Sequence, residues 1–174
     1  KAKNPNAIYA CDPVMGNAKS GCHVSDNIPP LLRDKVVPAA DLITPNQFEL
    51  GYLTERDVTD LDSTLAAVDA AREMGPSTVL VTSVERPDAP EDVMEMIAVD
   101  DKGKWIVRTP RLPFKRNGSG DVTAALFTGH YLRGGDAADA LARTASSVYN
   151  MLRLTHEADS QAVSYTHLRA HETK

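Results

Sequence analysis

The segment Asn117-Gly118-Ser119-Gly120-Asp121 places a carboxylate directly after two glycines, at the expected start of a helix. Glycine permits a tight backbone twist and the close approach of another group. Unpaired N–H groups at a helix start, together with the helix dipole, attract anions. A carboxylate there suits a base that takes a proton from an alcohol while phosphate contacts the amides. An ordinary glycine turn with a first-turn acid explains the same residues.

Further polar residues stand where short apolar runs end. The runs over 7–11, 41–44 and 78–82 have the composition of buried strands. The side chains at or just after their ends are Asp12, Thr44, Asn46, Thr82 and Ser83. Because ligands of parallel α/β sheets bind beyond the carboxyl ends of the strands, we expect these side chains to converge on the edge that carries the glycine segment.

Helical patterns separate the expected strands. They begin at Pro29, after Asn46 and at Asp62, and two more cover about 120–133 and 136–152. A glycine-bearing polar loop is expected from Met15 to about Asn27, and a hairpin from 91–99 and 104–108. Strands that alternate with helices predict parallel βαβ units in an α/β layered fold.

Composition narrows the function classes. A chain of 174 residues suits one domain with a sizeable core. Its net charge of −5 provides no basic field for nucleic acid or an anionic membrane. No run approaches the length of apolar sequence that crosses a bilayer. Cys11 and Cys22 form no metal or redox motif, and we interpret them as reduced thiols of a cytoplasmic protein.

Three segments occur in a specific order along the chain. They are Asp12-Pro13-Val14-Met15-Gly16, the stretch 34–50, and Gly118-Ser119-Gly120-Asp121. Together they resemble the pyridoxal kinases of the ribokinase-like superfamily, from about Ala7 to about Leu152. The resemblance implies a ribokinase-like layered fold, with a mostly parallel central sheet flanked by helices. It also implies ATP-dependent phosphorylation of the 5′-hydroxymethyl group of pyridoxal, pyridoxine or pyridoxamine, with Mg²⁺ as the cofactor and a monovalent cation as a further candidate.

The resemblance assigns the glycine segment to catalysis. Asp121 matches the aspartate that contacts the substrate hydroxyl and acts as its base. Gly118, Ser119 and Gly120 match an anion hole, where backbone amides stabilise charge on the transferring group.

Six further residues match positions around the nucleotide, namely Asp12, Thr44, Asn46, Glu49, Thr82 and Ser83. The resemblance makes Asp12 and Glu49 the expected metal-binding residues, and this agrees with the preference of Mg²⁺ for oxygen ligands and retained water. The segment through Lys19, Gly21 and Val24 matches a loop that folds over ATP. Simpler roles also fit some of them: Asn46 and Glu49 have the spacing of a helix capping box, and Thr82 and Ser83 are common residues at a strand end.

The resemblance further implies that the chain is incomplete at its N-terminus. We expect residues 1–161 to be the C-terminal, ATP-binding and catalytic part of a kinase domain that forms a homodimer when full-length. Most of the substrate pocket would then lie upstream. The segment 162–174 has no clear core face, and we interpret it as a non-native tail.

Two alternatives to a pyridoxal kinase remain. Hydroxymethylpyrimidine (phosphate) kinase shares the Asp-Pro-Val-Met and Thr-Pro-Asn themes, but its anion hole usually ends in cysteine where this chain has Asp121. The continuation Gln47-Phe48-Glu49 also favours a pyridoxal kinase. An inactive nucleotide-binding fragment would bind ATP without turnover.

Overall fold

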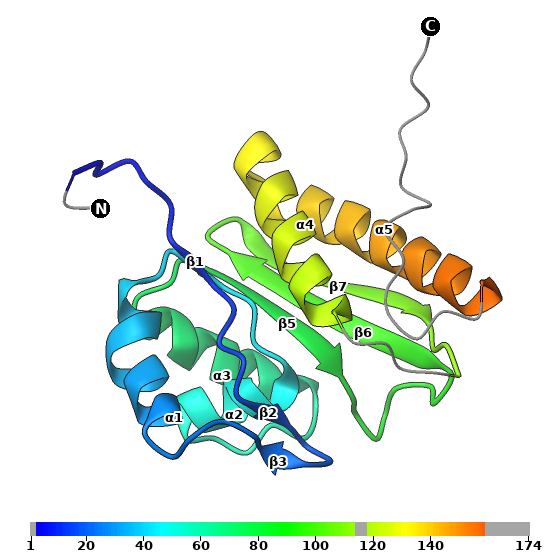
Figure 1. The fold of residues 1–174 in the computed structure, drawn as a ribbon, viewed down its shortest axis with the longest axis horizontal. Coiled ribbons are helices and arrows are strands. Elements are labelled where there is room, and N and C mark those ends of the chain that lie inside the picture. Colours follow the sequence, from blue (N-terminus) through cyan, green and yellow to red (C-terminus); the bar gives the residue numbers. More distant parts are fainter. Residues whose placement is uncertain (1–2, 114–117, 159–174) are drawn as a thin grey trace, which may run out of the picture.

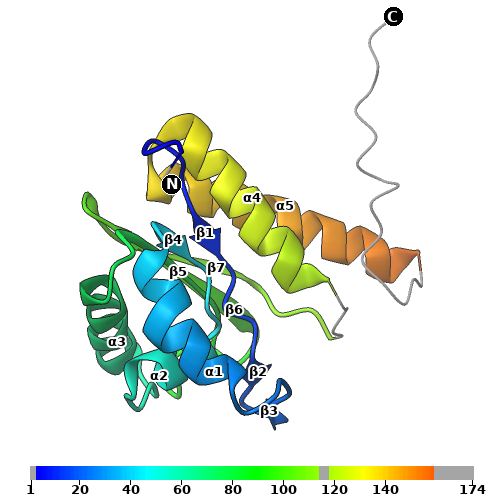
Figure 2. The ribbon, with the colours of Figure 1, turned by 60° about the vertical axis from the view of Figure 1, so that its left-hand side comes forward.

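The computed structural model describes residues 3–113 and 118–158, so Asn117 and the expected tail over 162–174 lie outside it. The described chain forms three layers, with a central sheet between two groups of helices (Figures 1 and 2). The layered α/β fold expected from the alternation of strands and helices is confirmed.

The central sheet has five strands in the order β1-β4-β5-β6-β7. Their bounds are β1 (Ala10–Cys11), β4 (Leu42–Ile43), β5 (Thr78–Val84), β6 (Val93–Asp100) and β7 (Gly103–Pro110). β4 pairs in parallel with both β1 and β5, whereas β6 pairs antiparallel with β5 and β7. The described sheet is therefore mixed rather than mostly parallel, because the expected hairpin joins it as two antiparallel strands.

The helices cover both faces of this sheet. They are α1 (Ile28–Leu31), the π-helical turn η1 (Leu32–Val36), the 3₁₀ turn η2 (Val37–Ala39), α2 (Gln47–Thr54), α3 (Leu61–Glu73), α4 (Ser119–Gly134) and α5 (Ala137–Glu157). Figures 1 and 2 show α1, α2 and α3 on one face and α4 and α5 on the other. No helix in the described ranges is long and apolar enough to span a membrane.

The helix expected from Pro29 is interrupted. Val37 donates its N–H to Leu32, five residues earlier, and Pro38 follows inside the 3₁₀ turn. Proline has no N–H to donate and crowds the preceding turn, so a regular α-helix cannot continue through it.

Alternate side chains of β5 enter two separate cores. Val79 and Val81 pack into the cluster beneath α2 and α3. Leu80 packs on the opposite face with Phe127 of α4 and Leu141 of α5. This alternation follows from the two-residue period of a strand. It fixes both α2 and α4 against the sheet, and these are the helices whose first turns carry the candidate residues.

The loop expected over 15–27 contains a small hairpin of β2 (Gly16–Asn17) and β3 (Gly21–Cys22). A Cβ atom on Gly16 would lie 2.2 Å from the Gly21 carbonyl oxygen, so the two strands can approach only if position 16 is glycine. β2 packs against α2, and Figure 2 shows the hairpin beyond the chain segment that leads out of β1.

Candidate active site

A cavity of about 250 Å³ lies where the strand ends meet the first turns of α2 and α4. Its lining residues are Asp12, Val14, Gly16, Asn17, His23, Thr44, Asn46, Glu49, Thr82, Gly118, Gly120 and Asp121. The cavity brings together all the site residues expected from the sequence except Ser83 and Ser119. The predicted convergence of strand ends and glycine segment is therefore present in the structure.

The start of α4 presents backbone and carboxylate to this cavity. Gly118 is the N-cap, with φ of 86°, a left-handed conformation that favours glycine. No side chain caps the helix, and the first amides of any α-helix lack acceptors within it. A Cβ atom on Gly120 would meet nothing within 4 Å, so the space beside the bend is open. Asp121 is exposed in the first turn.

Asp12 faces Asp121 from the end of β1. Its Oδ1 accepts a hydrogen bond of 3.0 Å from the hydroxyl of Thr44, which follows β4. Burial raises the pKa of Asp12, the Thr44 hydrogen bond opposes that increase, and the charge of Asp121 adds to it. The two carboxylates therefore make this part of the cavity electronegative, which suits a cation.

Asn46 and Glu49 form the capping box that their spacing predicts. Asn46 Oδ1 accepts the Glu49 N–H at 2.9 Å, and Glu49 Oε2 accepts the Asn46 N–H at 2.8 Å. Asn46 Nδ2 also donates to the Gly16 carbonyl at 2.8 Å. The cap of α2 is thus bonded to the β2–β3 hairpin.

Glu49 strengthens that connection. Its Oε1 accepts the N–H groups of Met15 at 2.9 Å and Gly16 at 3.4 Å, and the residue is only 4% exposed. Burial raises the pKa of Glu49; its backbone hydrogen bonds oppose the increase, and the charge of Asp12 adds to it. Both carboxylate oxygens therefore already accept backbone N–H groups.

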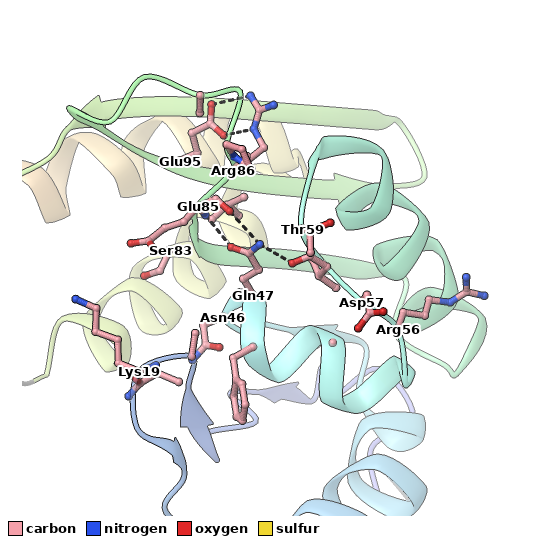
Figure 3. A pocket seen from close by; sticks show the side chains of 18 of the residues that line it. Lys19, Asn46, Gln47, Arg56, Asp57, Thr59, Ser83, Glu85, Arg86 and Glu95 are labelled. Carbon is pink, nitrogen blue, oxygen red and sulfur yellow. Dashed lines mark hydrogen bonds and ion pairs between the residues drawn. The ribbon is translucent and has the colours of Figure 1, made fainter.

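The two remaining predicted residues lie elsewhere. Ser83 lines a larger, open cavity of about 1210 Å³, which shares Asn17 and Asn46 with the smaller one (Figure 3). The Ser119 carbonyl accepts a 2.7 Å hydrogen bond from the Thr123 hydroxyl within α4. Lys19, expected in a loop over the nucleotide, also lines the larger cavity.

The sequence pattern assigned the segment after Met15 to a loop over the nucleotide, but it did not single out Asn17 and His23, which line the cavity. Asn17 Nδ2 lies 3.3 Å from His23 Nε2, and the His23 N–H donates to the Met15 carbonyl at 2.9 Å. Among the described residues that line the smaller cavity, His23 is the only one whose side chain can carry a positive charge. The glycines at positions 16 and 21 were the available signal of the hairpin that brings it there.

A metal ion would have few protein ligands here. The described residues contain no group of three or more His, Cys, Asp or Glu placed to hold one. This arrangement fits Mg²⁺, which is commonly bound by one or two carboxylates with water and substrate phosphates. Asp12 fits that role, whereas the oxygens of Glu49 are engaged with backbone N–H groups.

The layered sheet and the cavity at its strand ends are those of a kinase family. The chain belongs to the phosphomethylpyrimidine kinase family, which it matches over residues 1–166.

The chain also shares high sequence identity with individual proteins. The chain is 70% identical to "Pyridoxal kinase PdxY" of Corynebacterium diphtheriae, over 92% of this chain and 57% of that protein. It is 71% identical to "Pyridoxal kinase PdxY" of Leifsonia xyli subsp. xyli, over 90% of this chain and 56% of that protein. The resemblance to pyridoxal kinases is therefore confirmed, and the chain spans little more than half the length of these relatives.

Solved structures share the fold. Pyridoxal kinase from Leishmania donovani, in complex with ADP and ginkgotoxin, matches with a TM-score of 0.83 and 24% identity, over 95% of this chain and 57% of that one. A putative phosphomethylpyrimidine kinase from Bacteroides thetaiotaomicron, crystallised with pyridoxal, matches with a TM-score of 0.77 and 28% identity, over 87% of this chain and 55% of that one. The ribokinase-like architecture is thereby confirmed.

Proposed function

We propose that this chain is the ATP-binding and catalytic part of a pyridoxal kinase. The observation that carries the proposal is the placing of Asp121, Asp12 and the open first turn of α4 around one cavity. The relatives at 70% and 71% identity carry the name pyridoxal kinase, which supports the same activity for a protein that contains this chain.

Asp121 is the proposed base. Its exposed carboxylate lines the cavity, so a substrate hydroxyl can reach it. The hydroxyl oxygen forms a bond to the γ-phosphorus of ATP while the bond from that phosphorus to the β-phosphate oxygen breaks. The hydroxyl proton passes to Asp121, and ADP leaves. Backbone amides at Gly118 and Gly120 stabilise negative charge on the transferring group, because they are fixed before the reaction begins.

The other lining residues place the nucleotide. Thr44 holds the Asp12 carboxylate, and Asn46 and Glu49 fix the β2–β3 hairpin at the cavity. We assign Mg²⁺ to Asp12, with Glu49 acting through its charge or through water. When bound, the ion would neutralise phosphate charge. Burial is the main cause of the raised pKa of Asp12, and the charge of Asp121 adds to it; a cation bound beside Asp12 would offset both effects.

Hydroxymethylpyrimidine (phosphate) kinase is the second candidate. The family that matches residues 1–166 is described as phosphomethylpyrimidine kinase. The Bacteroides thetaiotaomicron structure is named a putative phosphomethylpyrimidine kinase, and it was crystallised with pyridoxal. The acid at position 121 and the continuation Gln47-Phe48-Glu49 favour the pyridoxal reaction.

A substrate comparison tests the proposal. The assay needs a protein of the relatives' full length, because the chain matches only 57% of the Corynebacterium diphtheriae protein. The unmatched part of that protein is therefore fused to the present chain to give a hybrid protein. Phosphorylated products are then measured by mass spectrometry with ATP and each alcohol. We expect higher kcat/KM for pyridoxal than for hydroxymethylpyrimidine. The reverse preference would overturn the substrate assignment, and ATP binding without either product would support a non-catalytic module.

A further inference from the structure

Strand β5 contains an irregularity where it passes the two cavities. Val81 pairs with Ile97, but Val84 pairs with Glu95, so β5 has one more residue than β6 over this interval. The extra residue makes a β-bulge at Thr82–Ser83. Ser83 has φ of 53°, in the left-handed region that serine rarely adopts. Bulges redirect side chains beside active sites, and a strained backbone persists only where its surroundings hold it.

The N-terminal side of the bulge is held by the chain that leads into α2. The Thr82 N–H donates to the Pro45 carbonyl at 2.9 Å. Asn46 forms an isolated parallel bridge with Thr82. The residues that cap α2 therefore also fix Thr82 at the smaller cavity.

The C-terminal side is held by the next residue of α2, Gln47. Its Oε1 accepts the Glu85 N–H at 2.7 Å, and its Nε2 donates to the Glu85 carbonyl at 3.1 Å and to the Val58 carbonyl at 2.8 Å. Figure 3 shows the Gln47 amide reaching across the larger cavity to both segments. One side chain thus bonds both backbone groups of Glu85, two residues after Ser83.

Arg86, the residue after Glu85, also holds this segment in place. The Arg86 side chain is 4% exposed and forms a bidentate pair with Glu95 of β6, with Nε 2.7 Å from Oε2 and NH2 3.1 Å from Oε1. Arg86 fixes the chain to the sheet beyond the bulge. Gln47 instead bonds Glu85, one residue nearer to Ser83, and both Gln47 and Ser83 line the larger cavity.

We propose that Gln47 is a positioning residue for nucleotide binding. Its amide holds the bulged backbone in the shape that presents Thr82 and Ser83 to the nucleotide. This inference rests on the proposed function, because the bulge matters only if a nucleotide contacts it. Loss of the Gln47 amide should therefore weaken nucleotide binding. Because Gln47 does not line the smaller cavity, which contains Asp121, the same change should leave proton transfer at Asp121 unchanged.

The test compares two variants of the 174-residue chain. Gln47→Met keeps the length of the side chain and removes its three hydrogen bonds. Thr54→Val is the matched control, because it removes a 2.8 Å hydrogen bond to the Leu50 carbonyl in the same helix, outside the lining of both cavities. ADP affinity with Mg²⁺ is measured by calorimetry, thermal stability by melting, and the exposure of residues 82–86 by amide hydrogen exchange.

We expect Gln47→Met to weaken ADP binding about tenfold and to speed exchange at Glu85. Thr54→Val should lower the melting temperature without weakening ADP binding. A double-mutant cycle with Ser83→Gly adds a second readout, because glycine adopts the left-handed conformation without strain. In that background the loss of affinity caused by Gln47→Met should be smaller.

The outcomes separate the two proposals. Failure of the unmodified chain to bind ADP would overturn the nucleotide site and, with it, this inference. Equal ADP affinity in the unmodified chain and Gln47→Met would overturn the positioning role alone. The same conclusion would follow if Thr54→Val weakened ADP binding as much as Gln47→Met did, since the effect would then reflect helix stability.

Discussion

Replacement of Glu49 by alanine tests how the cavity is held together. The Glu49 carboxylate is 4% exposed and accepts N–H groups from Met15, Gly16 and Asn46. Glu49→Ala leaves the Met15 and Asn46 donors without their acceptor. It also weakens the connection between the cap of α2 and the β2–β3 hairpin, which then depends on the hydrogen bond from Asn46 Nδ2 to the Gly16 carbonyl. We therefore expect the variant to lose both stability and the local order of the hairpin.

The size of the effect follows from the two shorter bonds, at 2.9 Å from Met15 and 2.8 Å from Asn46. Hydrogen bonds to a charged group contribute roughly 1.5–3 kcal/mol each. Burial raises the pKa of Glu49, which shows that the desolvated carboxylate offsets part of this gain. We expect Glu49→Ala to lower the free energy of unfolding by about 2–4 kcal/mol. Glu49→Gln keeps one acceptor oxygen and should cost about half as much.

The assay is urea unfolding, with hydrogen exchange at Met15 and Gly16 as the local readout. Glu55→Gln is the control on the neighbouring turn, because the Glu55 side chain is 75% exposed in its ion pair with Arg33. Such a pair contributes about 0–1 kcal/mol. The reasoning is refuted if Glu49→Ala stays within about 0.5 kcal/mol of the unmodified chain, or if Glu55→Gln costs as much.

Other predictions concern charge. Asp12→Asn should raise the free energy of unfolding of the chain near neutral pH by about 0.5–2 kcal/mol, as melting would show, and abolish phosphoryl transfer in the hybrid protein, as turnover would show. The pKa of Asp12 is higher in the folded state than in the unfolded state, chiefly because of burial. As pH rises from about 4, the unfolded state therefore loses this proton first, and the unmodified chain should lose stability relative to Asp12→Asn. Urea titrations at several pH values would measure the difference. Arg86→Met should cost about 3 kcal/mol, since it removes a buried pair with Glu95 and leaves that carboxylate paired with the exposed Arg108; an unchanged urea midpoint would contradict this.

Much of the site follows from local sequence patterns. Strand-end residues such as Asp12 and Thr44 could be placed because parallel strands end at the same edge of a sheet. The capping box of Asn46 and Glu49 follows from a three-residue spacing. The β6–β7 hairpin follows from two strand-like runs around a glycine-bearing turn.

The remaining features depend on contacts between distant segments. The Gln47 amide bonds Glu85, 38 residues away, and no local pattern indicates that partner. The bulge at Ser83 reflects its pairing with β6 rather than its own sequence. The end of the helix that begins at Pro29 could have been predicted, because Pro38 follows within a few turns and cannot continue a regular α-helix.

The central claim is that Asp121 takes the substrate proton beside the nucleotide. The most direct measurement is the kcat of Asp121→Asn in the hybrid protein, together with its affinity for ADP and Mg²⁺. A base that acts mainly in the transition state predicts a fall of about 10³-fold or more in kcat, with nucleotide affinity largely kept. A fall of less than about tenfold would contradict the assignment of Asp121 as the base.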